Sequence, residues 1–145
     1  MYLDSCVIVK LVSHEPDSAA YDRLVRSRPV TTSELAVAEV RSALLAEERR
    51  GRTSRPARRA GRRLFQERVR NGAFELLLPL NRLVIERAGG VIEQSHPKVP
   101  LCILDAIHVA TAELHGGDAM CSSDLRVQDA CACLGLALAP TPPVS

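Results

Sequence analysis

"MYLDSCVIVKLV" (residues 1–12) opens the chain with an apolar run that is broken by a carboxylate. Tyr2 and Leu3 predict a short buried strand that ends at Asp4, and residues 5–11 predict a helix directly after it. A strand followed at once by a helix is the first unit of an alternating α/β chain. Because Asp is rarely buried without a partner, the position of Asp4 needs a physical reason.

The remainder of the chain repeats this alternation. Further short strands are predicted at residues 29–33, 74–80, 119–123 and 136–140. Helices are predicted at residues 16–28, 34–50, 54–69, 81–93, 105–115 and 124–134. Short apolar strands that alternate with helices are typical of a parallel sheet covered on both faces. The sequence therefore predicts an α/β fold with five parallel strands.

Size and composition limit the possible classes of protein. The 145 residues, 46% of them hydrophobic, are expected to form one domain at residues 1–140, followed by a loose tail at residues 141–145. No apolar run approaches the roughly 20 residues needed to span a bilayer, so a soluble, cytoplasmic protein is expected. The five cysteines lack paired C-x-x-C spacing, which indicates neither a disulfide framework nor a zinc site.

Positive charge is concentrated in one segment. Residues 49–70 hold ten arginines and one acid, a local charge of +9 in a chain whose net charge is +2. One helical face is formed by arginines at three- and four-residue spacing, namely Arg55, Arg58, Arg59, Arg62 and Arg63. A solvated helix face usually mixes both signs of charge, and this face does not. It predicts a surface for RNA phosphates or for an acidic protein partner, and the sequence leaves both open.

Four acids are expected near the carboxyl ends of the strands, where ligands bind in an open α/β sheet. Asp4 closes the first predicted strand, Asp124 follows the fourth, and Asp105 begins an otherwise apolar helix. The fourth acid, Glu39, lies on a helical stripe that is expected to be buried. That stripe consists of Leu35, Glu39, Ser42, Ala43 and Ala46.

Each acid also has an ordinary structural explanation. Asp105 and Asp124 could be helix N-caps, and Asp4 or Glu39 could form a salt bridge with Lys10 or Arg41. Four carboxylates in one pocket would repel by several kcal/mol per close pair, at an effective dielectric constant of about 20. They would need a divalent cation or bound protons.

A hard cation, Mg²⁺ or Mn²⁺, suits a group of carboxylates without clustered His or Cys. Such a site favours hydrolysis of phosphodiesters, because the metal lowers the pKa of a water that attacks phosphorus. Ser5 and Ser122 each stand beside a strand end and could orient a carboxylate or that water. His108, three residues after Asp105, is interpreted as a packed, hydrogen-bonded residue outside the site.

Three blocks of sequence resemble the PIN-domain ribonucleases, and more closely the VapC-type toxins of bacterial toxin-antitoxin pairs. They are YLDSCVIVKLVSHEPDS (2–18), TTSELAVAEVRSAL (31–44) and LDAIHVATAELHGGDAMCSSDLRV (104–127). The resemblance implies a three-layer α/β/α sandwich with a five-stranded parallel twisted sheet. It also implies a Mg²⁺- or Mn²⁺-dependent endoribonuclease whose acids correspond to Asp4, Glu39, Asp105 and Asp124.

The resemblance further implies a cognate VapB-type antitoxin that covers the metal site, and a homodimer. The chain departs from the family pattern after the first Asp, where Thr and then Ser or Asn are usual and Ser5 and Cys6 stand here, and at Ser122, where Thr is more common. The thiol of Cys6 is expected to lose a good hydrogen-bonding group near the metal. Neither departure removes an acid.

Three alternatives use the same acids differently. A phosphatase of the haloacid-dehalogenase type needs a second Asp two residues after Asp4, where this chain has Cys6. A receiver-like domain would need neither Glu39 nor the basic segment. In a noncatalytic RNA-binding module the acids would only cap helices. Stabilisation by Mn²⁺ would distinguish a metal site from such a module.

Overall fold

The computed structural model of the protein describes residues 1–77, 79–116 and 119–142. Within these residues the chain forms a four-stranded sheet in the order β3-β2-β1-β4. The strands are β1 (Tyr2–Leu3), β2 (Thr31–Ser33), β3 (Glu75–Leu77) and β4 (Met120–Cys121). Every pair of neighbouring strands is parallel, as the alternation of strands and helices predicts.

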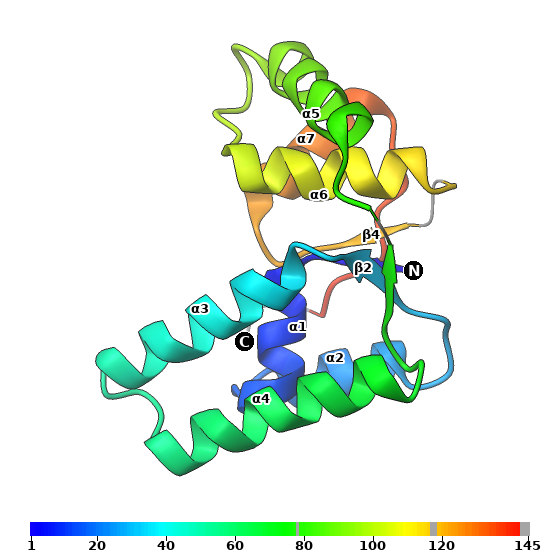
Figure 1. The fold of residues 1–145 in the computed structure, drawn as a ribbon. Helices are drawn as coiled ribbons and strands as arrows, with labels where there is room; N and C mark the ends of the chain where they lie inside the picture. The colour runs from blue at the N-terminus through cyan, green and yellow to red at the C-terminus, as the bar shows by residue number, and fades with distance from the viewer. Residues whose placement is uncertain (78, 117–118, 143–145) are drawn as a thin grey trace.

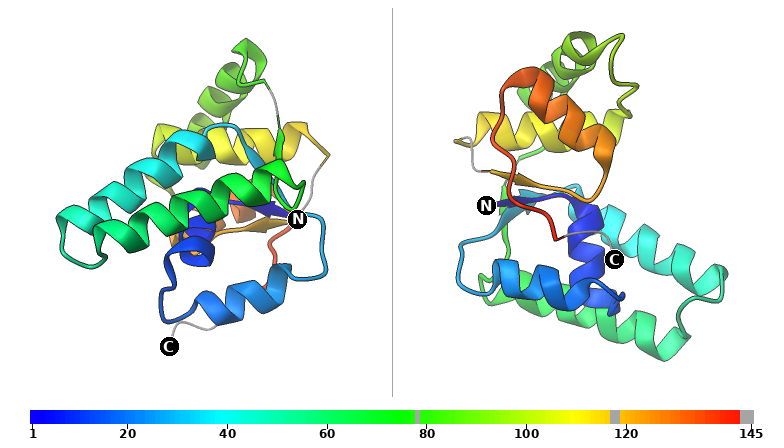
Figure 2. Two further views of the ribbon diagram at one scale, coloured as in Figure 1. Left: turned by 60° about the horizontal axis from the view of Figure 1, so that its bottom comes forward. Right: turned by 180° about the vertical axis from the view of Figure 1, so that it is seen from behind.

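Seven helices among the described residues cover the two faces of this sheet (Figures 1 and 2). One face carries α1 (Ser5–Ser13), α2 (Ser18–Val25), α3 (Ala36–Arg49) and α4 (Arg55–Arg70). The other carries α5 (Arg82–Ser95), α6 (Ile103–Leu114) and α7 (Leu125–Leu134). The protein is therefore a three-layer α/β/α sandwich.

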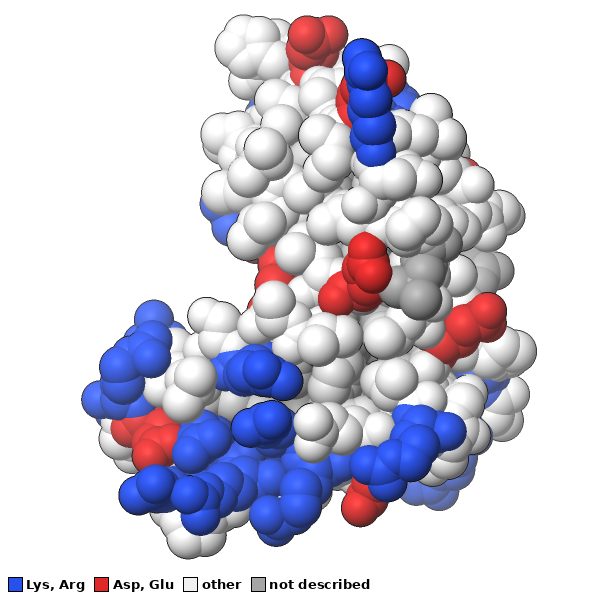
Figure 3. Space-filling model, in the orientation of Figure 1, with Lys and Arg blue, Asp and Glu red and all other residues white. Residues whose placement is uncertain are grey.

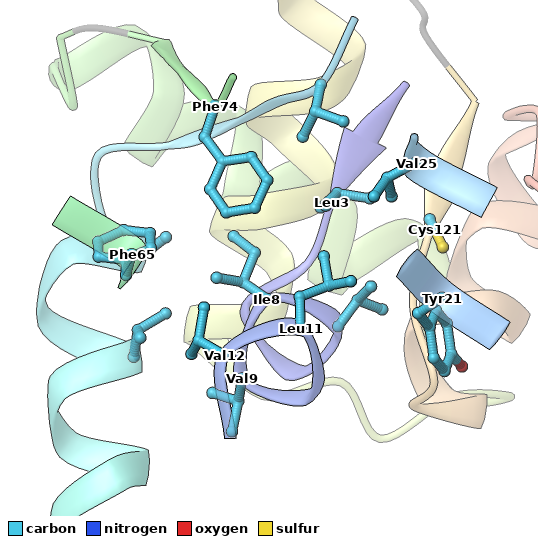
Figure 4. Packing of buried hydrophobic residues seen from close by; sticks show 14 of the residues in the cluster. Leu3, Ile8, Val9, Leu11, Val12, Tyr21, Val25, Phe65, Phe74 and Cys121 are labelled. Carbon is cyan, nitrogen blue, oxygen red and sulfur yellow. The ribbon is translucent and has the colours of Figure 1, made fainter. Parts of the chain in front are cut away.

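Each face of the sheet has its own hydrophobic core. In β1, Tyr2 points into the core beneath α5, α6 and α7, whereas the next residue, Leu3, points into the core around α1. Met120 and Cys121 of β4 divide between the two cores in the same way. This division follows from the two-residue period of a strand. Figure 4 shows the α1 side, where apolar residues of α1, α2 and α4 gather beneath Leu3.

Helices α3 and α4 form a long antiparallel pair that extends beyond the sheet (Figure 1). Helix α4 is anchored to α1 at Gly61, which is buried because the carbonyl group of Val12 lies directly against it. A Cβ atom at position 61 would lie 2.6 Å from that oxygen. The close contact of the two helices therefore depends on the missing side chain.

The sheet order places the switch of chain direction between β1 and β4. Strand β1 connects through α1 and α2 to β2 on one side, whereas β4 joins the other side of β1 after α5 and α6. Ligands of open α/β sheets bind outside the carboxyl ends of strands at such a point. Asp4 follows β1 there, and residues 122–124 follow β4.

The prediction of five strands is wrong among the described residues. The segment predicted at 136–140 lies parallel to β4 but forms only an isolated bridge, between Leu138 and Met120. Two backbone hydrogen bonds hold it, from the amide of Met120 to Ala137 and from the amide of Ala139 to Met120. The next amide facing β4 would be that of Thr141, but the carbonyl of Ser122 that it would meet accepts Nε2 of Gln128 at 2.8 Å instead.

Smaller differences concern element ends. Helix α6 begins at Ile103, so that Asp105 lies in its first turn and is not its starting residue. Helix α3 begins at Ala36, although the hydroxyl of Ser33 does accept a hydrogen bond from the amide of Leu35. Of the predicted tail, residues 143–145 lie outside the described residues, as does residue 78 of the strand predicted at 74–80.

Two further expectations can be compared with the structure. All five cysteines are free, as their spacing predicts. In the part of the chain that the structure describes, no helix combines the length and hydropathy that a membrane-spanning segment requires.

Candidate functional site

The four predicted acids line one cavity of about 360 Å³ at the carboxyl ends of β1 and β4. Asp4 comes from the β1–α1 junction, Glu39 from the first turn of α3, Asp105 from the first turn of α6, and Asp124 from the residue before α7. The cavity is also lined by Ser5, Cys6, Val9, Ser42, Ala43, Ala46 and Leu104. Four segments that are distant in sequence thus meet at the switch point of the sheet.

Helix α3 turns a different side to the core than the sequence suggests. Four residues of the stripe, Glu39, Ser42, Ala43 and Ala46, line the cavity and are not fully buried, whereas Ala36, Val40 and Leu44 face the core. Glu39 keeps 21% of its side chain exposed. The helix therefore directs this carboxylate to the cavity wall and not into the hydrophobic interior.

Asp4 is buried, with 5% of its surface exposed, and it is held by short polar side chains. The hydroxyl of Ser122 donates a hydrogen bond of 2.6 Å to Oδ2 of Asp4, and it accepts the backbone amide of Asp124 at 3.0 Å. Ser122 thus connects two of the four acids through hydrogen bonds.

Cys6 retains the hydrogen bond that the sequence led us to regard as lost. Its thiol lies 3.2 Å from Oδ2 of Asp4, and it accepts hydrogen bonds from the amide and hydroxyl of Ser123. Burial and the nearby charge of Asp4 raise the pKa of Cys6 to about 12. The thiol is therefore protonated near neutral pH and can donate to the carboxylate.

Glu39 is the centre of a hydrogen-bonded network that the sequence analysis missed. Ser5 donates to its Oε2 at 2.5 Å, and Nε2 of His108 lies 2.6 Å from the same oxygen. The other ring nitrogen of His108, Nδ1, lies 2.7 Å from the hydroxyl of Tyr2. Because an ionised Glu39 can only accept, Nε2 carries a proton, and a neutral His108 accepts the Tyr2 hydroxyl at Nδ1.

The two ionisable groups of this network stabilise one another. Burial alone would raise the pKa of Glu39, but the hydrogen bond and charge of His108, with the hydrogen bond of Ser5, lower it. Burial alone would lower the pKa of His108, but the hydrogen bond to Glu39 and the charge of Asp4 raise it. His108 is buried and packed, as interpreted from the sequence, and it acts behind the cavity lining through its hydrogen bond to Glu39. Its i+3 relation to Asp105 on one helix face was the available signal.

Asp105 has a buried oxygen, Oδ2, that finds no hydrogen-bond partner among the residues that the structure describes. Burial and the charges of Asp4 and Asp124 raise the pKa of this carboxyl, while the guanidinium of Arg126 opposes the shift. A buried carboxylate oxygen without a partner is costly and is a signal of an additional ligand. Asp105 does not act as a helix N-cap, because Cys102 occupies that position.

Asp124 does serve as a helix N-cap, and Oδ1 accepts the backbone amide of Arg126 at 2.8 Å. The side chain of Arg126 binds the same carboxylate, with Nη2 2.8 Å from Oδ2. The hydrogen bond from this guanidinium lowers the pKa of Asp124 despite partial burial. The sequence analysis missed Arg126, since no spacing rule relates it to the other three acids.

The salt-bridge explanation of Asp4 and Glu39 is not supported. Lys10 binds Glu15 and Asp17, at 3.2 and 2.8 Å, and lies on the far turn of α1. Glu39 is bound by His108 and Ser5, as described above. The two acids therefore face the cavity for a reason other than pairing with these basic residues.

Of the five arginines predicted to form one basic face, Arg58 does not belong to it. Its Nε binds Glu48 of α3, and only 14% of its side chain is exposed. We call the other four, Arg55, Arg59, Arg62 and Arg63, the arginine ridge; all are exposed. Three of them, with Pro56, line a shallow pocket, and Figure 3 shows basic side chains gathered over α4. Arg58 instead joins α4 to α3.

The donor set is suited to a hard divalent cation, although it is not assembled as it stands. Carboxylate oxygens surround the cavity, and Oδ2 of Asp105 is buried without a partner. In the described residues no group of three or more His, Cys, Asp or Glu is already arranged to hold an ion. Since Arg126 occupies Asp124, and Ser5 and His108 occupy Glu39, an ion would have to displace some of these contacts.

Comparison with known proteins agrees with this geometry. The family model of the PIN domain matches residues 1–132, so the chain belongs to the PIN-domain family. Within that family it is similar to Ribonuclease VapC46 of Mycobacterium tuberculosis, with 41% identity over 141 residues that cover 95% of each chain. The resemblance to VapC-type PIN ribonucleases predicted from the sequence is thereby confirmed.

Proposed function

We propose that the protein is the toxin of a VapBC-type toxin-antitoxin pair and hydrolyses phosphodiester bonds of RNA in the cytoplasm with Mg²⁺ or Mn²⁺. The prediction of an RNA-hydrolysing enzyme is confirmed by the family match and the VapC relative. The observation that supports the metal site is the partnerless buried oxygen of Asp105 in a cavity with three further carboxylates.

In this proposal all four acids act on the cation or on its bound water. Asp4, Asp105 and Asp124 would hold the cation, and Glu39 would hold it or its water from the opposite wall. Ser122 fixes the Oδ2 oxygen of Asp4, and Ser5 fixes the Oε2 oxygen of Glu39. These hydroxyls keep the carboxylates oriented while the negative substrate approaches.

A divalent cation, when bound, would supply charge stabilisation at phosphorus and a water of lowered pKa. The residues that line the cavity contribute hydrogen-bond acceptors, and none of these described side chains is available as a nucleophile. The thiol of Cys6 is protonated, and the hydroxyl of Ser5 already donates to Glu39. Hydrolysis without a covalent intermediate is therefore the reaction that these groups support.

Partners are part of the same proposal. Large apolar side chains lie exposed beside the cavity, with Ile103 exposed at 62% and Leu125 at 70%. An apolar rim around an acidic cavity would suit a VapB-type antitoxin that covers the site. The predicted homodimer remains a prediction, to be tested by sedimentation equilibrium.

The proposal is tested by cleavage of structured RNA with Mn²⁺ or Mg²⁺, using wild type, Asp4→Asn and Asp105→Asn. Both substitutions keep the shape of the side chain but remove a charge, so each should reduce the cleavage rate at least about a hundredfold. Asp129→Asn is the matched control, since Asp129 is exposed on α7 and does not line the cavity. Equal cleavage by all four proteins would show that the activity belongs to a contaminant or to another site.

A further inference from the structure

Arg126 brings a positive charge of the chain itself to the carboxylate cavity. Its Nε and Nη2 bind the two carboxylate oxygens of Asp124, at 3.3 and 2.8 Å. The same Nη2 atom lies 4.0 Å from Oδ2 of Asp105, the buried oxygen that has no hydrogen-bond partner. One guanidinium is therefore within reach of two of the four acids.

This contact occupies the oxygens that a metal ion would use. A guanidinium that grips both oxygens of a carboxylate is among the stronger side-chain hydrogen-bonding arrangements. Asp124 also accepts the backbone amide of Arg126 and caps α7, so its carboxylate is already engaged on two sides. The negative charge of Asp124 is therefore already largely compensated by Arg126 when a cation approaches.

The guanidinium can leave without disturbing the core. The Arg126 side chain is 48% exposed and extends from the first turn of α7, whereas Asp105 and Asp124 keep only 22% and 29% of their side chains exposed. Rotation of Arg126 into solvent would break its ion pairs with Asp124 and Asp105 and its contact with Sγ of Cys102, but no hydrophobic contact of the two cores. The contact is thus strong enough to compete with an ion, yet it is reversible.

We propose that Arg126 is the counter-ion of the metal-free site and competes with the divalent cation for Asp124, so that it lowers the metal affinity of the RNA-free enzyme. The inference rests on the metal site of the proposed function. It assigns Arg126 a positioning role, because it acts on the metal through Asp124.

The test is a calorimetric titration of the metal-free protein with Mn²⁺ at constant ionic strength. Arg126→Gln should bind Mn²⁺ about tenfold more tightly than wild type, since one competing charge beside two ligands is removed. Arg126→Lys keeps the charge but loses the two-pronged grip, and its affinity should lie between the two. Arg82→Gln is the matched control: this arginine is 90% exposed on α5 and pairs with Glu86.

A double substitution locates the effect. In an Asp124→Asn background the contested carboxylate is gone, so Arg126→Gln should change the Mn²⁺ affinity by no more than about twofold. Equal or weaker binding by Arg126→Gln, compared with wild type, would overturn the inference and leave the proposed function intact. If neither wild type nor Arg126→Gln binds Mn²⁺, the inference and the proposed metal site are both wrong. Binding by Arg126→Gln but not by wild type would support the inference and the metal site.

Discussion

At the residue scale, the carboxyl group of Asp105 differs from the other three acids in its surroundings. Asp4, Glu39 and Asp124 each accept hydrogen bonds from named side chains, whereas Oδ2 of Asp105 is buried and accepts none. Burial and the charges of Asp4 and Asp124 raise its pKa. In the metal-free protein, ionisation of Asp105 therefore lowers the free energy of unfolding.

Asp105→Asn should raise the stability of the metal-free protein by about 1 kcal/mol near neutral pH. Removal of the Asp105 charge relieves its burial and its repulsion by the other acids, a gain of about 1–2 kcal/mol after solvent screening. It also removes about 0.5 kcal/mol of attraction between the carboxylate and the N-terminus of α6, which is the smaller effect. Because the folded pKa is raised, wild type gains stability from this group at low pH. It loses that gain as the pH rises from the ordinary value of 3.8 through the folded pKa.

Thermal unfolding with a chelator present measures this difference. The advantage of Asp105→Asn over wild type should grow across that pH interval and then stay constant. Asp129→Asn, an exposed substitution on α7, should leave the melting temperature nearly unchanged. A lower melting temperature for Asp105→Asn would contradict the repulsion argument.

The sequence predicts that the four acids lie together, but not which side chains contact them. Asp4 follows a strand, Asp124 precedes a helix, and Glu39 and Asp105 lie in first turns of helices, positions close to those expected from apolar periodicity. His108 reaches Glu39 from α6 and Arg126 turns back onto Asp124, through side-chain directions that periodicity does not determine. The same limit placed Arg58 in the basic face, because its pairing with Glu48 depends on how α4 lies against α3.

At the scale of elements, the contact of α4 with α1 is limited by the backbone itself. Gly61 is buried against the carbonyl of Val12. A side chain added at position 61 would therefore meet backbone atoms, which cannot move aside by a change of rotamer. Gly89 of α5 is the opposite case, since nothing lies within 4 Å of the place where its Cβ would stand. The two glycines differ in packing while both lie within helices.

Gly61→Ala should therefore destabilise the protein by about 1–3 kcal/mol, because the new methyl group would force α4 away from α1. Gly89→Ala should stabilise it by up to about 1 kcal/mol through helix propensity alone. Urea unfolding followed by circular dichroism measures both changes. Similar effects of the two substitutions would show that helix propensity decides and that the α1–α4 contact can adjust.

Most elements could be predicted because their local signals agree with the final structure. The Asn81 and Ser54 caps, for example, do begin α5 and α4. The prediction of a fifth strand was wrong because its apolar residues satisfied the pattern, while its pairing depended on β4, which has only two residues and whose following carbonyl, that of Ser122, accepts Gln128. The prediction that the α3 stripe is buried was wrong because periodicity identifies which residues share a helix face, but not whether that face contacts the core or a cavity.

At the scale of the whole molecule, charge is divided between two surfaces. The acids line the cavity at the carboxyl ends of β1 and β4, while the arginine ridge lies on the exposed side of α4 (Figure 3). The four ridge arginines are exposed, whereas Arg58 and Arg68 of the same helix are paired with Glu48 and Asp22. A ridge of exposed guanidiniums suits the phosphates of RNA, and we expect it to hold substrate away from the acids.

Arg59→Gln/Arg63→Gln should reduce the slope of log affinity against log salt by about 1.5, the value for two lost phosphate contacts. The measurement is fluorescence anisotropy of a labelled RNA hairpin with a chelator present, so that binding is observed without cleavage. Arg82→Gln/Lys98→Gln removes the same charge from exposed positions on and after α5 and should leave the slope unchanged. Equal slopes for both double variants would assign the effect to net charge and not to the ridge.

The hydrogen bonds of Ser122 have a consequence for synthesis of the protein. They join Asp4 to residues 122–124, which lie far along the chain from it, through β4, the strand that pairs with the other side of β1. A growing polypeptide on the ribosome therefore carries an incomplete cavity until β4 and the start of α7 have left the exit tunnel. Under the proposed function, a nascent chain that has not yet reached β4 would be unable to cleave RNA.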